Sequence, residues 1–229
     1  MIFRDLKQVK VVQTGDVRHL ITCIIFDCDG TLVDSEYLCN LALQIKLREY
    51  SVVESAERLL LKYRGGKLAT ILQSIESEHN IQLPEGFVAD YRYLVDQLFE
   101  KDLKECAGAS QMLADLKLAK CVASSGPLHK IHSALSITDL LKFFSGNIYS
   151  SYQIDSWKPE PGIFLYAASQ MGFAAKQCAV LEDGLVGVTA AIAAGMLPIL
   201  YDPQRIHRVP QGVISIADMS ELPSVLAKH

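Results

Sequence analysis

The 229-residue sequence lacks several features that would point to whole classes of protein. No apolar run approaches the roughly 18 residues of a membrane-spanning helix, and the first twenty residues have no apolar signal-peptide core. No Gly-x-Gly-x-x-Gly follows a strand-like run, so the dinucleotide-binding fingerprint is missing. The net charge of −4 argues against nucleic acid as the main partner. We therefore expect a cytoplasmic protein that binds neither membrane nor nucleic acid.

The sequence also lacks a Cys-x-x-Cys pair among its six cysteines. Cys23, Cys121 and Cys178 lie in apolar, strand-like runs. This distribution is typical of reduced, mostly buried thiols in a cytosolic protein.

The pattern of apolar residues predicts the fold class. Half of the residues are hydrophobic, which allows a buried core. Residues 20–26 form a continuous run rich in β-branched residues, typical of a strand buried on both faces. Strands are expected over 20–26, 120–123, 147–150, 178–181, 197–200 and 213–216, and helices over 108–118, 125–135, 161–171 and 187–194. Such alternation predicts an α/β fold with an open, Rossmann-like parallel sheet. Small residues from Gly187 onward predict a helix packed closely on that sheet.

Residues 36–103 break this alternation. They show four helical patterns, over 37–49, 54–63, 67–79 and 85–101, with no strand between them. We interpret 36–103 as an all-helical insert, and 1–35 together with 104–229 as the α/β core. Residues 1–19 are either a tail or contribute an extra edge strand at 9–12.

The segment Asp27-Cys-Asp-Gly-Thr31 is the strongest candidate site, because it directly follows the first buried strand. Ligands of open α/β sheets bind at the carboxyl ends of the strands. Two carboxylates two residues apart on a turn can act as nucleophile and as proton donor if their environments separate their pKa values. A calcium loop is the alternative, but it needs a preceding helix, a ligand in place of Thr31 and glycine in place of Leu32.

In this motif and three later ones the sequence resembles the haloacid dehalogenase-like hydrolases, in particular their phosphatase branch with a helical cap. The later motifs are the strand Cys121–Ser124, Lys158 before a proline, and the strand-end acids in Val180–Asp183. The resemblance implies that the insert is a cap over the site. It is strongest to the branch that acts on phosphorylated sugars and sugar acids such as 6-phosphogluconate.

The resemblance also implies a catalytic role for four residues. Asp27 would attack phosphorus to form an aspartyl-phosphate, and Asp29 would protonate the leaving alcohol and later activate water. Lys158 would offset the charge of the nucleophile and the phosphoryl group. Ser124 would hydrogen-bond a phosphoryl oxygen, although an ordinary helix N-cap is the alternative for this residue.

A Mg²⁺ site is implied at the same place. Its ligands would be Asp27, the backbone carbonyl of Asp29, Glu182 and Asp183, which are the hard oxygen donors that Mg²⁺ prefers. The family often has serine or threonine where Gly184 stands. We expect that departure to alter the loop rather than to abolish the metal site.

The remaining candidates concern substrate binding. The backbone amides of Ser125 and Gly126 would help to hold the phosphoryl group. In the insert, Arg64 and Lys67 flank two glycines and would bind a second anionic group of the substrate; a solvated interhelical turn is the alternative. The expected ligand is a small phosphorylated metabolite, and the oligomeric state stays open.

Two other functions are open at this stage. A β-phosphoglucomutase-like enzyme would share all four motifs, but those mutases have histidine at the position of Cys39 and arginine at that of Leu68. A non-catalytic phosphate-binding protein on the same fold would be expected to have lost a catalytic carboxylate or Lys158, and neither is lost. Dehalogenases of the superfamily lack the second aspartate, so Asp29 argues against that reaction.

Overall fold

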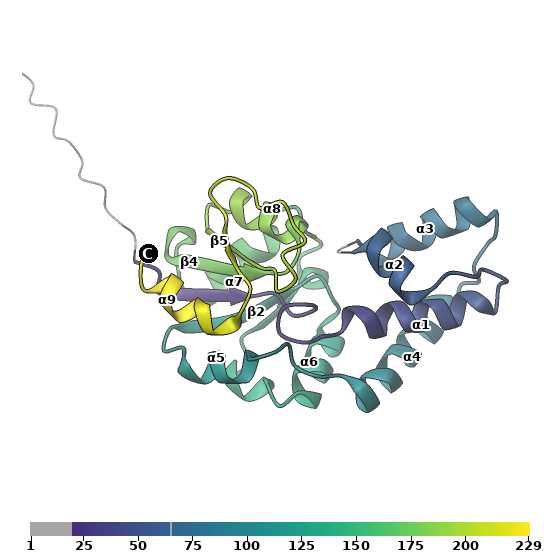
Figure 1. The fold of residues 1–229 in the computed structure, drawn as a ribbon, viewed down its shortest axis with the longest axis horizontal. Coiled ribbons are helices and arrows are strands. Elements are labelled where there is room, and N and C mark those ends of the chain that lie inside the picture. The colour runs from purple at the N-terminus through teal and green to yellow at the C-terminus, as the bar shows by residue number, and fades with distance from the viewer. Residues whose placement is uncertain (1–19, 65) are drawn as a thin grey trace, which may run out of the picture.

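The computed structural model describes residues 20–64 and 66–229. These form a sheet covered by helices on both faces, with a group of four further helices projecting to one side (Figure 1). The possible edge strand at residues 9–12 lies outside the described residues.

The sheet has six strands, all paired in parallel, in the order β3-β2-β1-β4-β5-β6. The strands are β1 (Cys23–Phe26), β2 (Ala119–Ser124), β3 (Ile148–Ser150), β4 (Cys178–Glu182), β5 (Leu197–Tyr201) and β6 (Ile214–Ile216). All six predicted strands are present. Because β1 lies between β2 and β4 and is covered on both faces, its four residues are fully buried and show no polar alternation.

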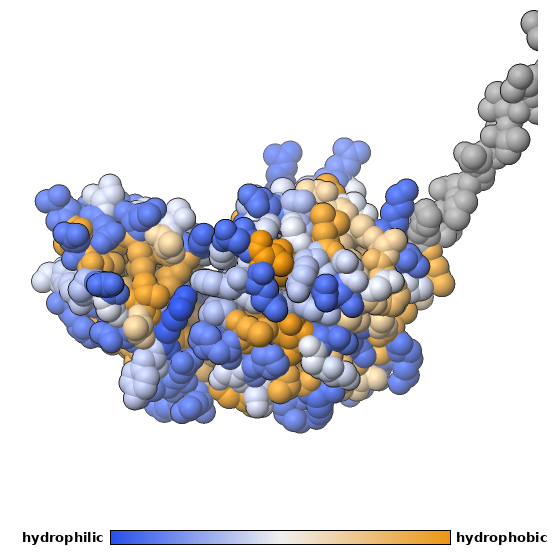
Figure 2. Space-filling model, turned by 180° about the vertical axis from the view of Figure 1, so that it is seen from behind, coloured by the Kyte–Doolittle hydropathy of each residue, from blue (hydrophilic) through white to orange (hydrophobic). Residues whose placement is uncertain are grey.

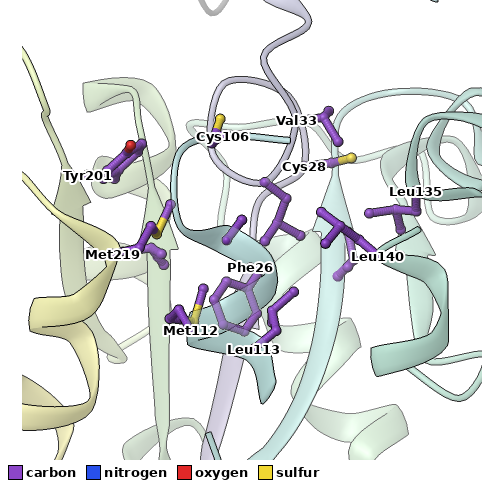
Figure 3. Packing of buried hydrophobic residues seen from close by; sticks show 14 of the residues in the cluster. Phe26, Cys28, Val33, Cys106, Met112, Leu113, Leu135, Leu140, Tyr201 and Met219 are labelled. Carbon is purple, nitrogen blue, oxygen red and sulfur yellow. The ribbon is translucent and has the colours of Figure 1, made fainter. Parts of the chain in front are cut away.

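Successive residues of β1 pack on opposite faces. Ile24 and Phe26 contribute to the core under α5 (Ala109–Asp115), α6 (Leu128–Ile137) and α9 (Leu222–Leu226), and Figure 3 shows Phe26 among Met112 and Leu113. Cys23 and Ile25 pack under α7 (Gly162–Met171) and α8 (Leu185–Ala193). Short 3-10 helices lie between these elements of the chain: η1 (Leu141–Phe143), η2 (Ser151–Gln153), η3 (Ala175–Gln177) and η4 (Met219–Glu221). The six cysteines are free, and five are buried.

Of the helix starts, that of α6 differs most from the prediction. The pattern over 125–135 placed the start of α6 at Ser125, but the helix begins at Leu128, with Pro127 at its N-cap. A proline disfavours helical backbone at the residue before it, which here is Gly126, so the helix cannot start earlier.

The insert is all-helical. It consists of α1 (Glu36–Arg48), α2 (Ala56–Tyr63), α3 (Leu68–His79) and α4 (Phe87–Asp102), which share a small apolar core of their own. Near the sheet, α4 packs on α6. The predicted fold class is thereby confirmed, whereas domain boundaries at 35/36 and 103/104 stay a prediction. Figure 2 shows the core and the insert from behind as two lobes covered mainly by hydrophilic side chains. Within residues 20–64 and 66–229, no helix combines the length and apolar character needed to cross a bilayer.

Candidate active site

Polar side chains gather where the three central strands end. Asp27 follows β1, and its amide donates to the carbonyl of Leu181 at 3.0 Å, so its backbone continues the pairing with β4. Ser124 is the last residue of β2, and Glu182 is the last residue of β4. All three side chains are buried. Because β2 and β4 each pair in parallel with β1, the carboxyl ends of the three strands lie at one edge of the sheet. This edge brings together residues far apart in the sequence, as the motif pattern predicted.

The chain turns sharply after Asp27. The Gly30 amide donates to the carbonyl of Val33 at 2.8 Å, and Gly30 has a φ of +78°, which favours glycine. A Cβ at this position would overlap the carboxyl group of Asp183. Gly30 therefore permits the turn and also leaves the space that Asp183 occupies.

Lys158 reaches the nucleophile candidate from the loop before α7. Its Nζ lies 2.5 Å from Asp27 Oδ1 and 2.5 Å from Glu182 Oε1, and its side chain is only 7% exposed. Burial alone would lower the pKa of Lys158, but the two carboxylates outweigh it and raise the pKa. The lysine thus stays charged, and it lies beside Asp27 as the sequence predicted.

Asp27, Glu182 and Asp183 form an acidic cluster, with one carboxyl oxygen of each within 4.8 Å of the others. Burial, followed by the charge of Asp27, raises the pKa of Glu182 to about 8 despite Lys158. Burial and neighbouring carboxylates likewise raise the pKa of Asp183. The raised pKa values mean that burial and mutual repulsion oppose the ionisation of these groups, and a bound cation would favour it. The three carboxyl groups therefore fit a small divalent cation that prefers oxygen ligands, such as Mg²⁺.

Gly187 has a more specific role than the sequence suggested. The small-residue pattern predicted only close packing of this helix on the sheet. In the structure a Cβ on Gly187 would overlap all three atoms of the Glu182 carboxyl group, so the glycine leaves room for that group. Gly184, at the N-cap of α8, is different, because a Cβ there would meet no atom of the described residues within 4 Å.

Asp29 is held by two residues that the sequence analysis did not single out. Lys130 Nζ donates to Oδ1 at 2.9 Å and to Oδ2 at 3.0 Å, and Ser35 Oγ donates to Oδ1 at 2.5 Å. Burial would raise the pKa of Asp29, but the charge of Lys130 and the bond from Ser35 outweigh it and lower the pKa. Asp29 is therefore ionised here. Its carboxylate is not part of the acidic cluster found among the described residues, and metal binding by its carbonyl stays a prediction.

The loop after β2 borders the same site. Ser124 Oγ accepts a hydrogen bond from the Gly126 amide at 3.1 Å, and α6 begins only at Leu128, so the N-cap alternative for Ser124 is wrong. A Cβ on Gly126 would lie 3.5 Å from Ser124 Oγ and 3.7 Å from Asp29 Oδ2. Gly126 therefore lies next to both side chains. Phosphoryl binding by the amides of Ser125 and Gly126 stays a prediction.

Arg64 and Lys67, the two cations between α2 and α3, contact residues near the site. Arg64 Nη2 is 2.7 Å from a carboxyl oxygen of Glu36, the first residue of α1. Lys67 Nζ lies 3.8 Å from the centre of the Trp157 ring, and Trp157 directly precedes Lys158. Both cations therefore contact residues near the site rather than water alone. Their predicted contact with substrate is a separate matter and stays a prediction.

Known proteins resemble the chain over most of its length. A model of the haloacid dehalogenase-like hydrolase family matches residues 21–195. The 6-phosphogluconate phosphatase of Escherichia coli K12 is 31% identical over 208 residues, which cover 90% of this chain and 94% of that protein. Hexitol phosphatase B of the same strain is 26% identical, with coverages of 91% and 96%. The crystal structure of a conserved haloacid dehalogenase-like protein from Agrobacterium tumefaciens C58 matches with a TM-score of 0.77 at 32% identity, covering 91% of this chain and 98% of that one.

Proposed function

Because the chain belongs to the haloacid dehalogenase-like hydrolases and is a phosphoric monoester hydrolase, we propose that it is a Mg²⁺-dependent phosphatase of small phosphorylated sugars or sugar acids, such as 6-phosphogluconate. The observation that carries the proposal is the buried Asp27 carboxylate, with Lys158 Nζ 2.5 Å away and an acidic cluster beside it. A buried carboxylate next to a permanent cation can approach a phosphate dianion that it would otherwise repel.

In the proposed reaction Asp27 supplies the nucleophile. Its carboxylate oxygen bonds to phosphorus while the bond from phosphorus to the leaving oxygen breaks, which gives an aspartyl-phosphate and an alcohol. Lys158 offsets the charge on Asp27 and on the transferred group. Mg²⁺, held by Asp27, the Asp29 carbonyl, Glu182 and Asp183, would offset the remaining phosphoryl charge.

Asp29 moves the protons in this proposal. Since Lys130 and Ser35 lower its pKa and favour the carboxylate, Asp29 has to gain a proton before it can protonate the leaving alcohol. Once it has done so, it is again a carboxylate and can take a proton from the water that attacks phosphorus in the second step. That step releases phosphate and restores Asp27.

The choice of substrate is supported by the position of Lys67. Lys67 lies at the border of cap and core, next to Trp157, where its ammonium can contact a carboxylate or second anionic group of the leaving alcohol. The printed names of the two curated relatives, a 6-phosphogluconate phosphatase and a hexitol phosphatase, agree with this substrate class. Cys39 and Leu68 supply neither imidazole nor guanidinium, which supports transfer to water over a mutase reaction.

The test is phosphate release from 6-phosphogluconate and from para-nitrophenyl phosphate with Mg²⁺, by the wild type and by Lys67→Ala. The variant should lower kcat/KM about tenfold for 6-phosphogluconate, the value of one charged contact, and change it little for the aryl phosphate. Lys62→Ala is the matched control, because this cap lysine pairs with Glu78 of α3. Equal losses on both substrates would contradict the assignment of Lys67.

A further inference from the structure

We propose that Lys130 is a positioning residue that holds the carboxylate of Asp29 in the orientation required for proton transfer. The inference rests on the phosphatase function proposed above and adds a residue to it. Lys130 lies on α6, in a helical segment where an amphipathic pattern gives no sign of a role in the site.

The contacts of Lys130 fix the orientation of Asp29. Its ammonium donates to both carboxylate oxygens, at 2.9 and 3.0 Å, while Ser35 Oγ, at the N-cap of α1, donates to Oδ1 at 2.5 Å. Two donors on different elements restrict rotation of the carboxylate about its side-chain bonds. Each carboxylate of the first motif thus has its own lysine, since Lys158 contacts Asp27 and Lys130 contacts Asp29.

The ammonium of Lys130 is itself held in place by the cap. Its Nζ lies 5.6 Å from the centre of the Phe99 ring on α4, and Tyr91 of α4 and Cys39 of α1 are also among its neighbours. Only 20% of the side chain is exposed. Lys130 therefore connects the base of the cap to a carboxylate of the core, and the packing of α4 on α6 sets its position.

Stability alone is a weak explanation for this pair. Both side chains are partly buried, with 20% of Lys130 and 28% of Asp29 exposed. Such an ion pair often contributes little net stability, because desolvation of the two charges offsets their attraction. The position of a proton-transferring group is more sensitive, since a displacement of about 1 Å can cost on the order of 100-fold in rate. The expected effect of losing Lys130 is therefore on the step that needs Asp29.

The first experiment compares two leaving groups in Lys130→Met. The sugar alkoxide of 6-phosphogluconate needs a proton from Asp29, whereas para-nitrophenolate leaves as a stable anion. Since kcat/KM reports on the steps up to formation of the aspartyl-phosphate, it should fall about 100-fold for 6-phosphogluconate and less than about fivefold for the aryl phosphate. Lys130→Arg should restore much of the loss, and Lys142→Met, which removes an exposed lysine paired with Asp139, should change neither value.

The second experiment asks whether Lys130 acts through Asp29. In an Asp29→Asn background, Lys130→Met should lower kcat/KM no further, whereas an equal additional loss would overturn the proposal. The double variant and Lys130→Arg also separate an effect on catalysis from an effect on folding, because neither leaves the Asp29 carboxylate without its cation. If Lys130→Met unfolds at the wild-type temperature, then equal losses of kcat/KM on the two substrates, or no loss on either, would overturn the proposed role of Lys130. The proposed phosphatase function would not be affected by that result. A wild type that released no phosphate would overturn the phosphatase function and this inference with it.

Discussion

Replacing Gly187 by alanine should disable the site through one methyl group. The Cβ would overlap the carboxyl group of Glu182, which is buried at the end of β4 with an oxygen 2.5 Å from Lys158 Nζ. The methyl group can fit only if Glu182 moves away from Lys158 and from the acidic cluster that it forms with Asp27 and Asp183. The charge balance around Asp27, the proposed nucleophile, would change with it.

The size of the effect follows from the overlap. Carbon atoms in contact are about 3.5–4.0 Å apart, so the carboxyl group has to shift by roughly 1 Å or more. Such a misplacement in an active site costs on the order of 100-fold, equivalent to about 2.7 kcal/mol of transition-state stabilisation. The fold should survive, because alanine gains about 1 kcal/mol over glycine in a helix, while overpacking costs about 1–3 kcal/mol. The melting temperature should therefore change by about 8 °C at most.

Gly184→Ala is the matched control, since it adds the same methyl group at the N-cap of the same helix, where the added Cβ would meet no described residue within 4 Å apart from its chain neighbours. Both variants would be assayed for kcat/KM and its Mg²⁺ dependence, and for thermal unfolding by circular dichroism. Gly187→Ala with native kcat/KM and native stability would refute the reasoning. An equal loss in Gly184→Ala would show that any change at the start of α8 is harmful.

Three further predictions concern the nucleophile, the metal and pH. Asp27→Asn should lower kcat by about 10⁶, as the loss of a nucleophile does in other hydrolases, with an unchanged circular dichroism spectrum; near-native turnover would contradict the mechanism. Excess EDTA should abolish activity, and Ca²⁺ should support it poorly because its longer bonds misplace Asp27; full activity in EDTA after removal of residual metal would contradict this. Because the pKa of Glu182 is raised from 4.5 to about 8, the folded protein binds more protons than the unfolded one between these values, so in EDTA the melting temperature should fall as pH rises from 5 to 8. Mg²⁺ should stabilise the protein most at the upper end of this range, and a flat profile in EDTA would count against the raised pKa.

The strands were predictable because they are buried on both faces and therefore appear as continuous apolar runs. The ends of the strands were less predictable. The apolar run Leu20–Phe26 predicted a strand that begins at Leu20, yet β1 begins at Cys23 and Leu20 is 68% exposed. An apolar run does not show where pairing with β2 and β4 starts. The four cap helices were found from their periodicity, to within about two residues at each end.

The site was predictable where its residues adjoin strand ends and unpredictable where they do not. Asp27, Ser124 and Glu182 adjoin strand ends, whereas Lys158 lies in the loop before α7 and was singled out only by the order of the four motifs. By contrast, 101 positions separate Lys130 from Asp29, and a lysine on an amphipathic helix normally faces solvent. The role of Gly187 depends on the position of one side chain, which no local pattern encodes.

The central position of β1 in the sheet has a consequence for how the chain folds during its synthesis. Its neighbours β2 and β4 follow about 95 and 155 residues later, because the whole cap intervenes. At synthesis rates of about 5–20 residues per second, β1 leaves the ribosome roughly 5–20 s before β2. The helices of the insert pack on one another and can form during this interval, while the apolar β1 stays unpaired and prone to aggregation. A chain released before β4 would carry the complete helical insert and Asp27, but neither Glu182 nor Asp183, and so would lack the acidic cluster.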